Sequence, residues 1–181
     1  MLDKNETKNQ FDALLKFGDR VISDAKDRLK AKHKINTGAL LQSLSYEVIY
    51  KDDNLHVNFR MMPYGTFVDK GVQGANPSAM KMGVQKAPNS PYKFGSGSSN
   101  GGLTKAIKKW TAQKGLSPRI NQSVKSMNFA ITRSIYLQGI SPTLFFTKAY
   151  NSEQKKMIGY VAQGLLEDGS KSFINNINIK K

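Results

Sequence analysis

Residues that could carry acid–base or metal chemistry are few in this 181-residue chain. The two histidines are His33, in the basic run KAKHK, and His56, in the alternating segment LHVNFRM. A metal site or a general base needs partner side chains at a defined spacing, and neither histidine has one. Cysteine is absent from the sequence, which excludes disulfide frameworks, thiol catalysis and zinc sites built on thiolates. We therefore expect both histidines to be surface residues.

The acidic residues also fail to suggest a reaction. Paired carboxylates occur at Asp24/Asp27, Asp52/Asp53 and Glu167/Asp168. Asp24 and Asp27 share a helix face but lie beside Lys26 and Arg28, which predicts solvated charges, and the second pair fits a turn. Glycosidase or two-metal chemistry would need carboxylates that converge in a buried site. A nuclease built on Asp69 lacks a second well-placed acid, so we expect no enzymatic activity, no metal and no cofactor.

A glycine-rich stretch resembles a phosphate-binding loop only in composition. Gly95, Gly97, Gly101 and Gly102 match neither of the two common phosphate-loop spacings, and no buried strand precedes them. We expect a flexible loop here. The wider segment 72–102 is rich in Gly, Ser, Asn and Pro, and a loop this long is usually functional or disordered. Met80, Met82 and Val84 alternate within it and could form a small strand, with Tyr92 and Phe94 as anchors.

Positive charge is concentrated in the second half of the chain. The formal net charge is +15; residues 1–90 contain 14 basic and 10 acidic residues, whereas residues 91–181 contain 14 basic and 3 acidic residues. The run KAIKKW predicts a helix with lysines on one side and Ile107 and Trp110 on the other. Such a face could contact phosphates or an acidic protein, or it could be an ordinary solvated face with Trp110 in the core. The candidate contact residues are Lys105, Lys108, Lys109, Lys114, Arg119 and Lys125.

Hydrophobic periodicity predicts the elements that would position these residues. We expect an α+β fold in a single domain of residues 1–181, with a loop and helices inserted at about 72–136. A long N-terminal helix is predicted at 8–32, an antiparallel β-hairpin from strands 43–50 and 55–61, and helices at 101–116, 121–138 and 152–172. Gly115 and Gly139 are the predicted helix ends. No apolar run reaches about 18 residues and the N-terminus lacks an apolar core, so we expect neither a membrane span nor a signal peptide.

The stretch PYGTFVDKG predicts a short helical turn that begins near Pro63 and ends at Gly71. Its apolar side chains, Tyr64, Phe67 and Val68, are expected to pack beneath the hairpin, and Asp69 and Lys70 to point the other way.

Three short motifs, in this order behind a long N-terminal helix, resemble one protein family. They are TGALLQSL (37–44), YGTFVDKG (64–71) and GISPTLFFTKAY (139–150). The pattern is similar to that of the tail-completion and neck (head–tail connector) proteins of tailed bacteriophages, the minor tail component group. The matching residues are Thr37, Gly38, Leu40, Ser43, Tyr64, Gly65, Phe67, Val68, Asp69, Gly71, Pro142, Phe145, Phe146 and Ala149. The segment 72–136 departs from the pattern because family members usually have a brief loop there.

The resemblance implies a structural virion protein without catalytic residues. It implies a homomeric ring of six or twelve subunits, made in the host cytoplasm and placed in the phage neck or tail, through which genome DNA passes. Partners would be further copies of the chain, portal or adaptor proteins and tail proteins, with DNA contact left open. Interface or architectural roles would fall to Tyr64, Phe67, Asp69, Gly71, Pro142, Phe145 and Phe146. The alternative is a standalone nucleic-acid-binding protein without sequence specificity that uses its basic C-terminal half.

Overall fold

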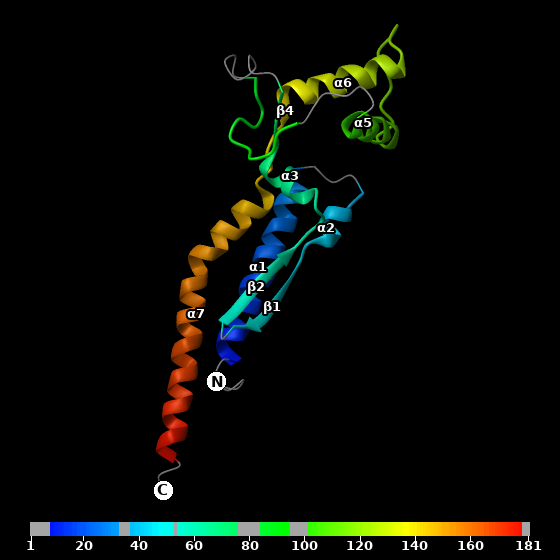
Figure 1. The fold of residues 1–181 in the computed structure, drawn as a ribbon. Helices are drawn as coiled ribbons and strands as arrows, with labels where there is room; N and C mark the ends of the chain where they lie inside the picture. Colours follow the sequence, from blue (N-terminus) through cyan, green and yellow to red (C-terminus); the bar gives the residue numbers. More distant parts are fainter. Residues whose placement is uncertain (1–7, 33–36, 53, 76–83, 95–100, 179–181) are drawn as a thin grey trace. The chain divides into compact units, whose positions relative to one another are not determined.

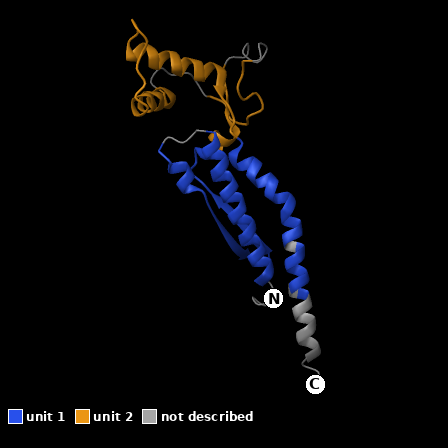
Figure 2. Cartoon of the chain, turned by 180° about the vertical axis from the view of Figure 1, so that it is seen from behind, with its two compact units in different colours: residues 1–65, 144–181 blue, residues 66–143 orange. Residues whose placement is uncertain are grey.

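The computed structural model describes residues 8–32, 37–52, 54–75, 84–94 and 101–178, and these fall into two compact units (Figure 2). Unit 1 consists of residues 1–65 and 144–181, and unit 2 of residues 66–143. The predicted α+β class is confirmed, with its long N-terminal helix, small antiparallel sheet and C-terminal helices. The expected insertion at 72–136 lies entirely within unit 2. That the chain folds as a single domain stays a prediction.

Unit 1 is built on two long antiparallel helices, α1 (Lys8–Ala31) and α7 (Phe145–Asn178), which lie side by side (Figure 1). Their direction is clear from the contacts: Gly164 approaches the backbone of Asn9, whereas Tyr150 contacts Phe17. α7 begins at Phe145, seven residues earlier than the sequence predicted. Leu144, the residue before the helix, has a φ of 53°. The helix begins at the next residue, so Phe145, Phe146 and Tyr150 are helical.

The predicted hairpin is present next to these helices. A short helix, α2 (Ala39–Ser43), precedes strands β1 (Ser45–Lys51) and β2 (Asn54–Arg60), which pair antiparallel from Ser45 with Arg60 to Lys51 with Asn54. The first strand starts two residues later than predicted because residues 39–43 are helical. Along β2 every second residue is half-buried and the others, including His56, are exposed, as the alternation predicted.

Aromatic rings form the centre of the unit 1 core. Phe17 of α1 is 2% exposed and meets Phe59 of β2 and Tyr150 of α7 edge to face, with ring centroids 6.0 Å apart in both pairs. Phe59 also meets Phe146, at 5.4 Å. Edge-to-face pairs add about 0.5–1.5 kcal/mol beyond the burial of their surface. One aromatic cluster therefore joins α1, the hairpin and α7.

Unit 2 contains a short helix and a helix pair. Helix α3 (Gly65–Lys70) leads into strand β3 (Val72–Gln73), which pairs antiparallel with β4 (Gly139–Ile140). Helices α5 (Gly102–Gln113) and α6 (Val124–Gln138) pack on each other, with Ile107 and Met127 buried, and the Thr111 hydroxyl donates to the Asn128 side-chain oxygen at 2.7 Å.

The ends of these two helices follow the sequence signals. After α5, the N–H of Leu116 donates to Thr111 O and that of Gly115, at φ 61°, to Ala112 O, which is a Schellman motif. At the start of α6, the Ser123 hydroxyl accepts from the Ser126 N–H at 3.1 Å. The predicted ends at Gly115 and Gly139 are confirmed.

The described part of the long loop packs on β3. Tyr92 and Phe94, the predicted anchors, contact Phe67 and Tyr136 respectively, with centroids 4.6 and 6.0 Å apart. The Gln73 N–H donates to Tyr92 O at 2.8 Å. Of the predicted small strand, Met80 and Met82 lie outside the described residues, and Val84 is 46% exposed.

Candidate functional site

Two of the motifs behind the resemblance meet in unit 2, although about 70 residues separate them in the sequence. The carbonyl oxygen of Val68 accepts from Thr143 twice, from its N–H at 3.1 Å and from its hydroxyl at 2.7 Å. Val72 and Gln73 then pair with Ile140 and Gly139. The YGTFVDKG and GISPT segments therefore hold each other by backbone groups.

Glycine is required at this junction because the two backbones approach closely. Gly71 has φ 73°, and a Cβ there would lie 2.4 Å from Ile140 O and 2.8 Å from Pro142 N. Gly139 has φ 88°, and its Cβ would meet Val72 O at 2.4 Å. The Ser90 hydroxyl donates to Gly71 O at 2.7 Å and ties the loop to the same place. Any side chain at either glycine would force the strands apart.

The first and second motifs meet in the same way in unit 1. A Cβ on Gly65 would lie 2.7 Å from Met61 Sδ and 2.8 Å from Leu40 Cδ1, so the absence of a side chain lets the two segments pack. The Ser43 hydroxyl donates to Leu40 O at 2.8 Å and accepts from the Met62 N–H at 3.0 Å. The TGALLQS turn thus packs against the residues that follow the hairpin, Met62 and Gly65.

The predicted packing of the aromatic residues in the second motif is wrong. Tyr64 and Phe67 are each 43% exposed, and Phe67 packs on Tyr92 of the loop. Asp69, expected to point outward, is 3% exposed. Lys70 is exposed as expected, so the prediction fails for Tyr64, Phe67 and Asp69, and the loop at 84–94 supplies the apolar partner for Phe67.

The late motif divides between the two units. Pro142 is exposed in unit 2, whereas Phe145 is completely buried in unit 1 and Phe146 is half-buried against Phe59. The burial of Phe145 and Phe146 fits an architectural role within the chain.

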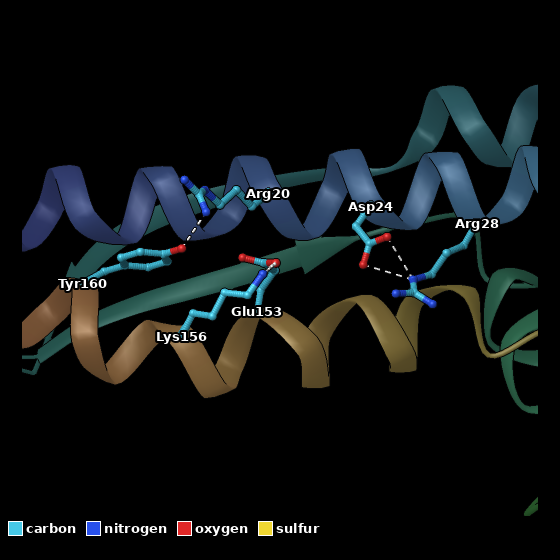
Figure 3. A network of polar contacts seen from close by, with 6 residues as sticks. All are labelled: Arg20, Asp24, Arg28, Glu153, Lys156 and Tyr160. Atoms are coloured by element: carbon cyan, nitrogen blue, oxygen red, sulfur yellow. Dashed lines mark hydrogen bonds and ion pairs between the residues drawn. The ribbon is translucent and has the colours of Figure 1, made fainter.

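Polar side chains that the sequence did not single out as a site lie along α1 and α7, and one contact, between Arg20 and Tyr160, joins the two helices (Figure 3). Arg20 donates to the Tyr160 hydroxyl at 2.5 Å, and its guanidinium carbon lies 5.1 Å from the centre of that ring. Glu153 is 6% exposed and pairs with Lys156 at 2.7 Å, which raises the pKa of the Lys156 ammonium. The only sequence signal is the spacing of Glu153 and Lys156, which are three residues apart on one helix.

The six candidate contact cations are all exposed. Lys105, Lys108 and Lys109 belong to α5 and Lys125 to α6, and Lys114 and Arg119 lie in the connection between them. Ile107 is buried as expected, but Trp110 is 37% exposed. Placing Trp110 in the core is therefore wrong; Thr111, on the other flank of Ile107, occupies the helix interface instead.

Helix α7 carries an exposed apolar stripe on the side away from α1. Buried Ala149, Glu153 and Gly164 mark its α1-facing side. Ile158 and Leu166 are each 75% exposed, Leu165 is 51% exposed, and Ala162 lies between them on the same side. In the sequence, the spacing of Met157, Val161, Leu165 and Leu166 predicts one apolar face for the last helix. That prediction is wrong for the two leucines, because they lie on the side of the helix opposite to the buried Ala149, Glu153 and Gly164.

Other candidate chemistry gains no support from the described geometry. Within the described ranges, no group of three His, Cys, Asp or Glu side chains is placed to hold a metal ion. In the same part of the chain, no helix is both long and apolar enough to cross a membrane. His33 lies outside the described residues.

Comparison with known proteins adds no identification: the chain matches no protein-family model, no curated protein and no solved structure.

Proposed function

We propose that this chain is a structural virion protein of a tailed bacteriophage, a subunit of a homomeric ring in the neck or tail. The observation that carries the proposal is the architectural use of the three motifs: they form close-packed junctions and supply rings to the core. TGALLQS receives the end of the hairpin at Gly65, YGTFVDKG pairs with GISPT, and LFFTKAY supplies aromatic rings to the core. Motifs that make such structural contacts suit a protein whose role is to assemble rather than to catalyse.

Assembly requires a surface for the neighbouring copy, and the stripe on α7 supplies one. Ile158, Leu165 and Leu166 together with Ala162 follow a spacing of four and three residues, which is typical of a helix that packs on another element. Complete burial of one such large side chain contributes about 1.5–3 kcal/mol. Several of them, repeated around a ring, favour association because each subunit buries its own stripe on the next.

The test measures the mass and shape of the purified full-length protein. We expect light scattering to give a multiple of the 20.1 kDa chain mass, and negative-stain electron microscopy to show closed rings of six or twelve subunits. Particles that remain monomeric at high concentration, both alone and mixed with portal and tail proteins of the same phage, would overturn the proposal.

A pair of variants locates the interface. The double substitution Ile158→Lys with Leu166→Lys is expected to shift the assembly to monomers, because a buried unpaired ammonium costs several kcal/mol. The matched control is Ile120→Lys, made at a site that is 95% exposed in unit 2, which should leave assembly unchanged. Equal loss of assembly in both variants would show that α7 is not the contact.

A further inference from the structure

Unit 2 has a surface of a single charge sign. Residues 66–143 contain eleven lysines and arginines and one acidic residue, Asp69, a formal net charge of +10. Asp69 is 3% exposed, so it adds almost nothing to the surface. Two thirds of the chain's net charge of +15 therefore belongs to this unit. Such a field attracts polyanions and releases their counterions on contact.

On α6 the cations alternate with an exposed aromatic ring. Lys125, Phe129 and Arg133 are four residues apart, and all three are exposed, Phe129 by 61%. Met127 and Asn128 form the buried side of the helix. An aromatic residue with this much exposure contributes little to the core. Between two cations, it has the arrangement in which a base stacks on the ring while phosphates meet the charges.

On α5 the cations point away from the packed side. Lys105 and Lys109 are one turn apart and lie opposite the buried Ile107, and Lys108 flanks them. Lys114 and Arg119 continue the charge along the connection to α6. Among the described residues no ion pair involves any of these cations. Their charge is therefore uncompensated by neighbouring carboxylates.

We propose that unit 2 binds nucleic acid through the exposed outward sides of its helix pair and the connection between them, together called the cationic surface: Lys105, Lys108 and Lys109 on α5, Lys114 and Arg119 in the connection, and Lys125, Phe129 and Arg133 on α6. The basic side chains contact phosphates, and Phe129 stacks on an exposed base. Lysine predominates over arginine, which favours point-charge contact with a backbone over bidentate reading of base edges, so binding is independent of sequence. An acidic protein would satisfy the charges but would not explain the ring held between Lys125 and Arg133. The proposal does not rest on ring formation.

Binding is measured on the full-length protein by fluorescence anisotropy, with a short labelled DNA single strand, the same sequence as duplex, and unlabelled polyglutamate as competitor. The variant combining Lys105→Gln, Lys109→Gln, Lys125→Gln and Arg133→Gln should lose at least about tenfold in affinity at low salt. Its log–log salt slope should be shallower by roughly three to four, since each lost phosphate contact removes about one.

A matched control distinguishes binding at the cationic surface of unit 2 from attraction by the overall net charge of the protein. Lys16 and Lys155 are exposed cations of unit 1, so Lys16→Gln with Lys155→Gln is compared with Lys105→Gln and Lys109→Gln, which makes the same change in net charge. The control pair should bind nearly as tightly as the unchanged protein. Equal losses in the two pairs would overturn the proposal, as would polyglutamate displacing the DNA as effectively as unlabelled DNA of the same charge.

The aromatic contact has its own readout. Phe129→Ala should weaken single-strand binding about fivefold or more and leave duplex binding nearly unchanged, because paired bases cannot stack on the ring. No effect on the single strand would overturn the stacking assignment. Circular dichroism checks that each variant is folded, and electron microscopy of the same samples reports ring formation, so failure of nucleic-acid binding and failure of assembly are distinguished.

Discussion

At the residue scale, the contact of Tyr46 with Gly18 shows how one missing side chain positions a hairpin. The Tyr46 ring lies on α1 at Gly18, and its hydroxyl donates to Leu15 O at 2.9 Å. Burial, together with the nearby Asp19 carboxylate, raises the pKa of Tyr46 to about 12. The absence of a side chain at Gly18 therefore lets the Tyr46 ring pack against the helix backbone.

The raised pKa predicts a specific alkaline titration. Because the folded state holds the phenol proton more tightly than the unfolded chain, whose pKa is 10.0, Tyr46 contributes stability below about pH 10. That contribution is lost as the pH rises towards 12. Ultraviolet difference titration should show a tyrosine that ionises near pH 12, and Tyr46→Phe should remove that step. Persistence of the late step in the variant would assign it to another tyrosine.

Two glycine substitutions on long helices should have opposite signs. In Gly18→Ala the new Cβ would lie 2.2 Å from the Tyr46 ring, so overpacking outweighs the gain in helix propensity, and we expect a net loss of about 1–2 kcal/mol. Gly159→Ala on α7 meets nothing within 4 Å and should stabilise by up to about 1 kcal/mol. Urea unfolding measures both, and a neutral Gly18→Ala would mean that the ring moves without cost.

At the element scale, short strands β3 and β4 matter more than their length suggests, because they join two distant motifs. Sequence reasoning predicted the turn at Gly71 and the helix end at Gly139 but not their pairing. Two-residue strands have no periodicity to detect, and nothing in the local sequence reports a partner about 70 residues away. In the structure, Gly71 and Gly139 both have positive φ, and both lie where a Cβ would meet the opposite backbone. These two properties mark the junction, and neither can be read from the local sequence.

Comparing alanine substitutions at two glycines with positive φ separates the cost of the backbone contact between Gly71 and Ile140 from the cost of the backbone conformation itself. Gly71→Ala adds a Cβ 2.4 Å from Ile140 O and must also keep φ at 73°. Gly115→Ala keeps φ at 61° but meets nothing within 4 Å. We expect about 1 kcal/mol of destabilisation at Gly115 from backbone strain alone, and at least about 2 kcal/mol more at Gly71. Thermal unfolding of both variants tests this, and equal losses would contradict the role assigned to the junction.

The long elements were the predictable ones. Apolar residues at helical spacing located α1, α5 and α6, and alternation located β2, because each buries one continuous face. Phe17 is 2% exposed and central to the aromatic cluster. Helical spacing nevertheless left it out of the predicted core face, which consists of Phe11, Leu14, Leu15, Gly18, Val21, Ile22, Ala25 and Leu29. Trp110 is the opposite case, because it was placed in the core but is 37% exposed. The neighbouring Thr111 is buried instead and donates a hydrogen bond to Asn128 of α6. Which residue of a turn faces the partner depends on that partner.

At the scale of the whole molecule, the charge imbalance between halves of the sequence becomes an imbalance between structural units. The sequence located the basic excess in residues 91–181 and proposed most of the cationic surface, but it did not indicate Phe129 or Arg133. It could not, because exposure of an apolar residue on an amphipathic helix depends on which side the neighbouring helix covers. For the same reason, the sequence alone does not predict that the stripe of α7 is exposed or that Glu153 is buried, because both depend on which side of α7 faces α1.

Unit 2 is one continuous segment of the sequence, whereas unit 1 is built from two separate segments. Every contact within unit 2 lies inside 66–143, whereas unit 1 closes only when α7 returns to α1 from more than a hundred residues away. During synthesis, residues 66–143 emerge complete while α1 and the hairpin still lack the helix that covers Phe17 and Phe59. The aromatic faces of α1 and the hairpin therefore wait, uncovered, until the last fifth of the chain has been made, and this interval is when a chaperone or a second nascent copy has access to them.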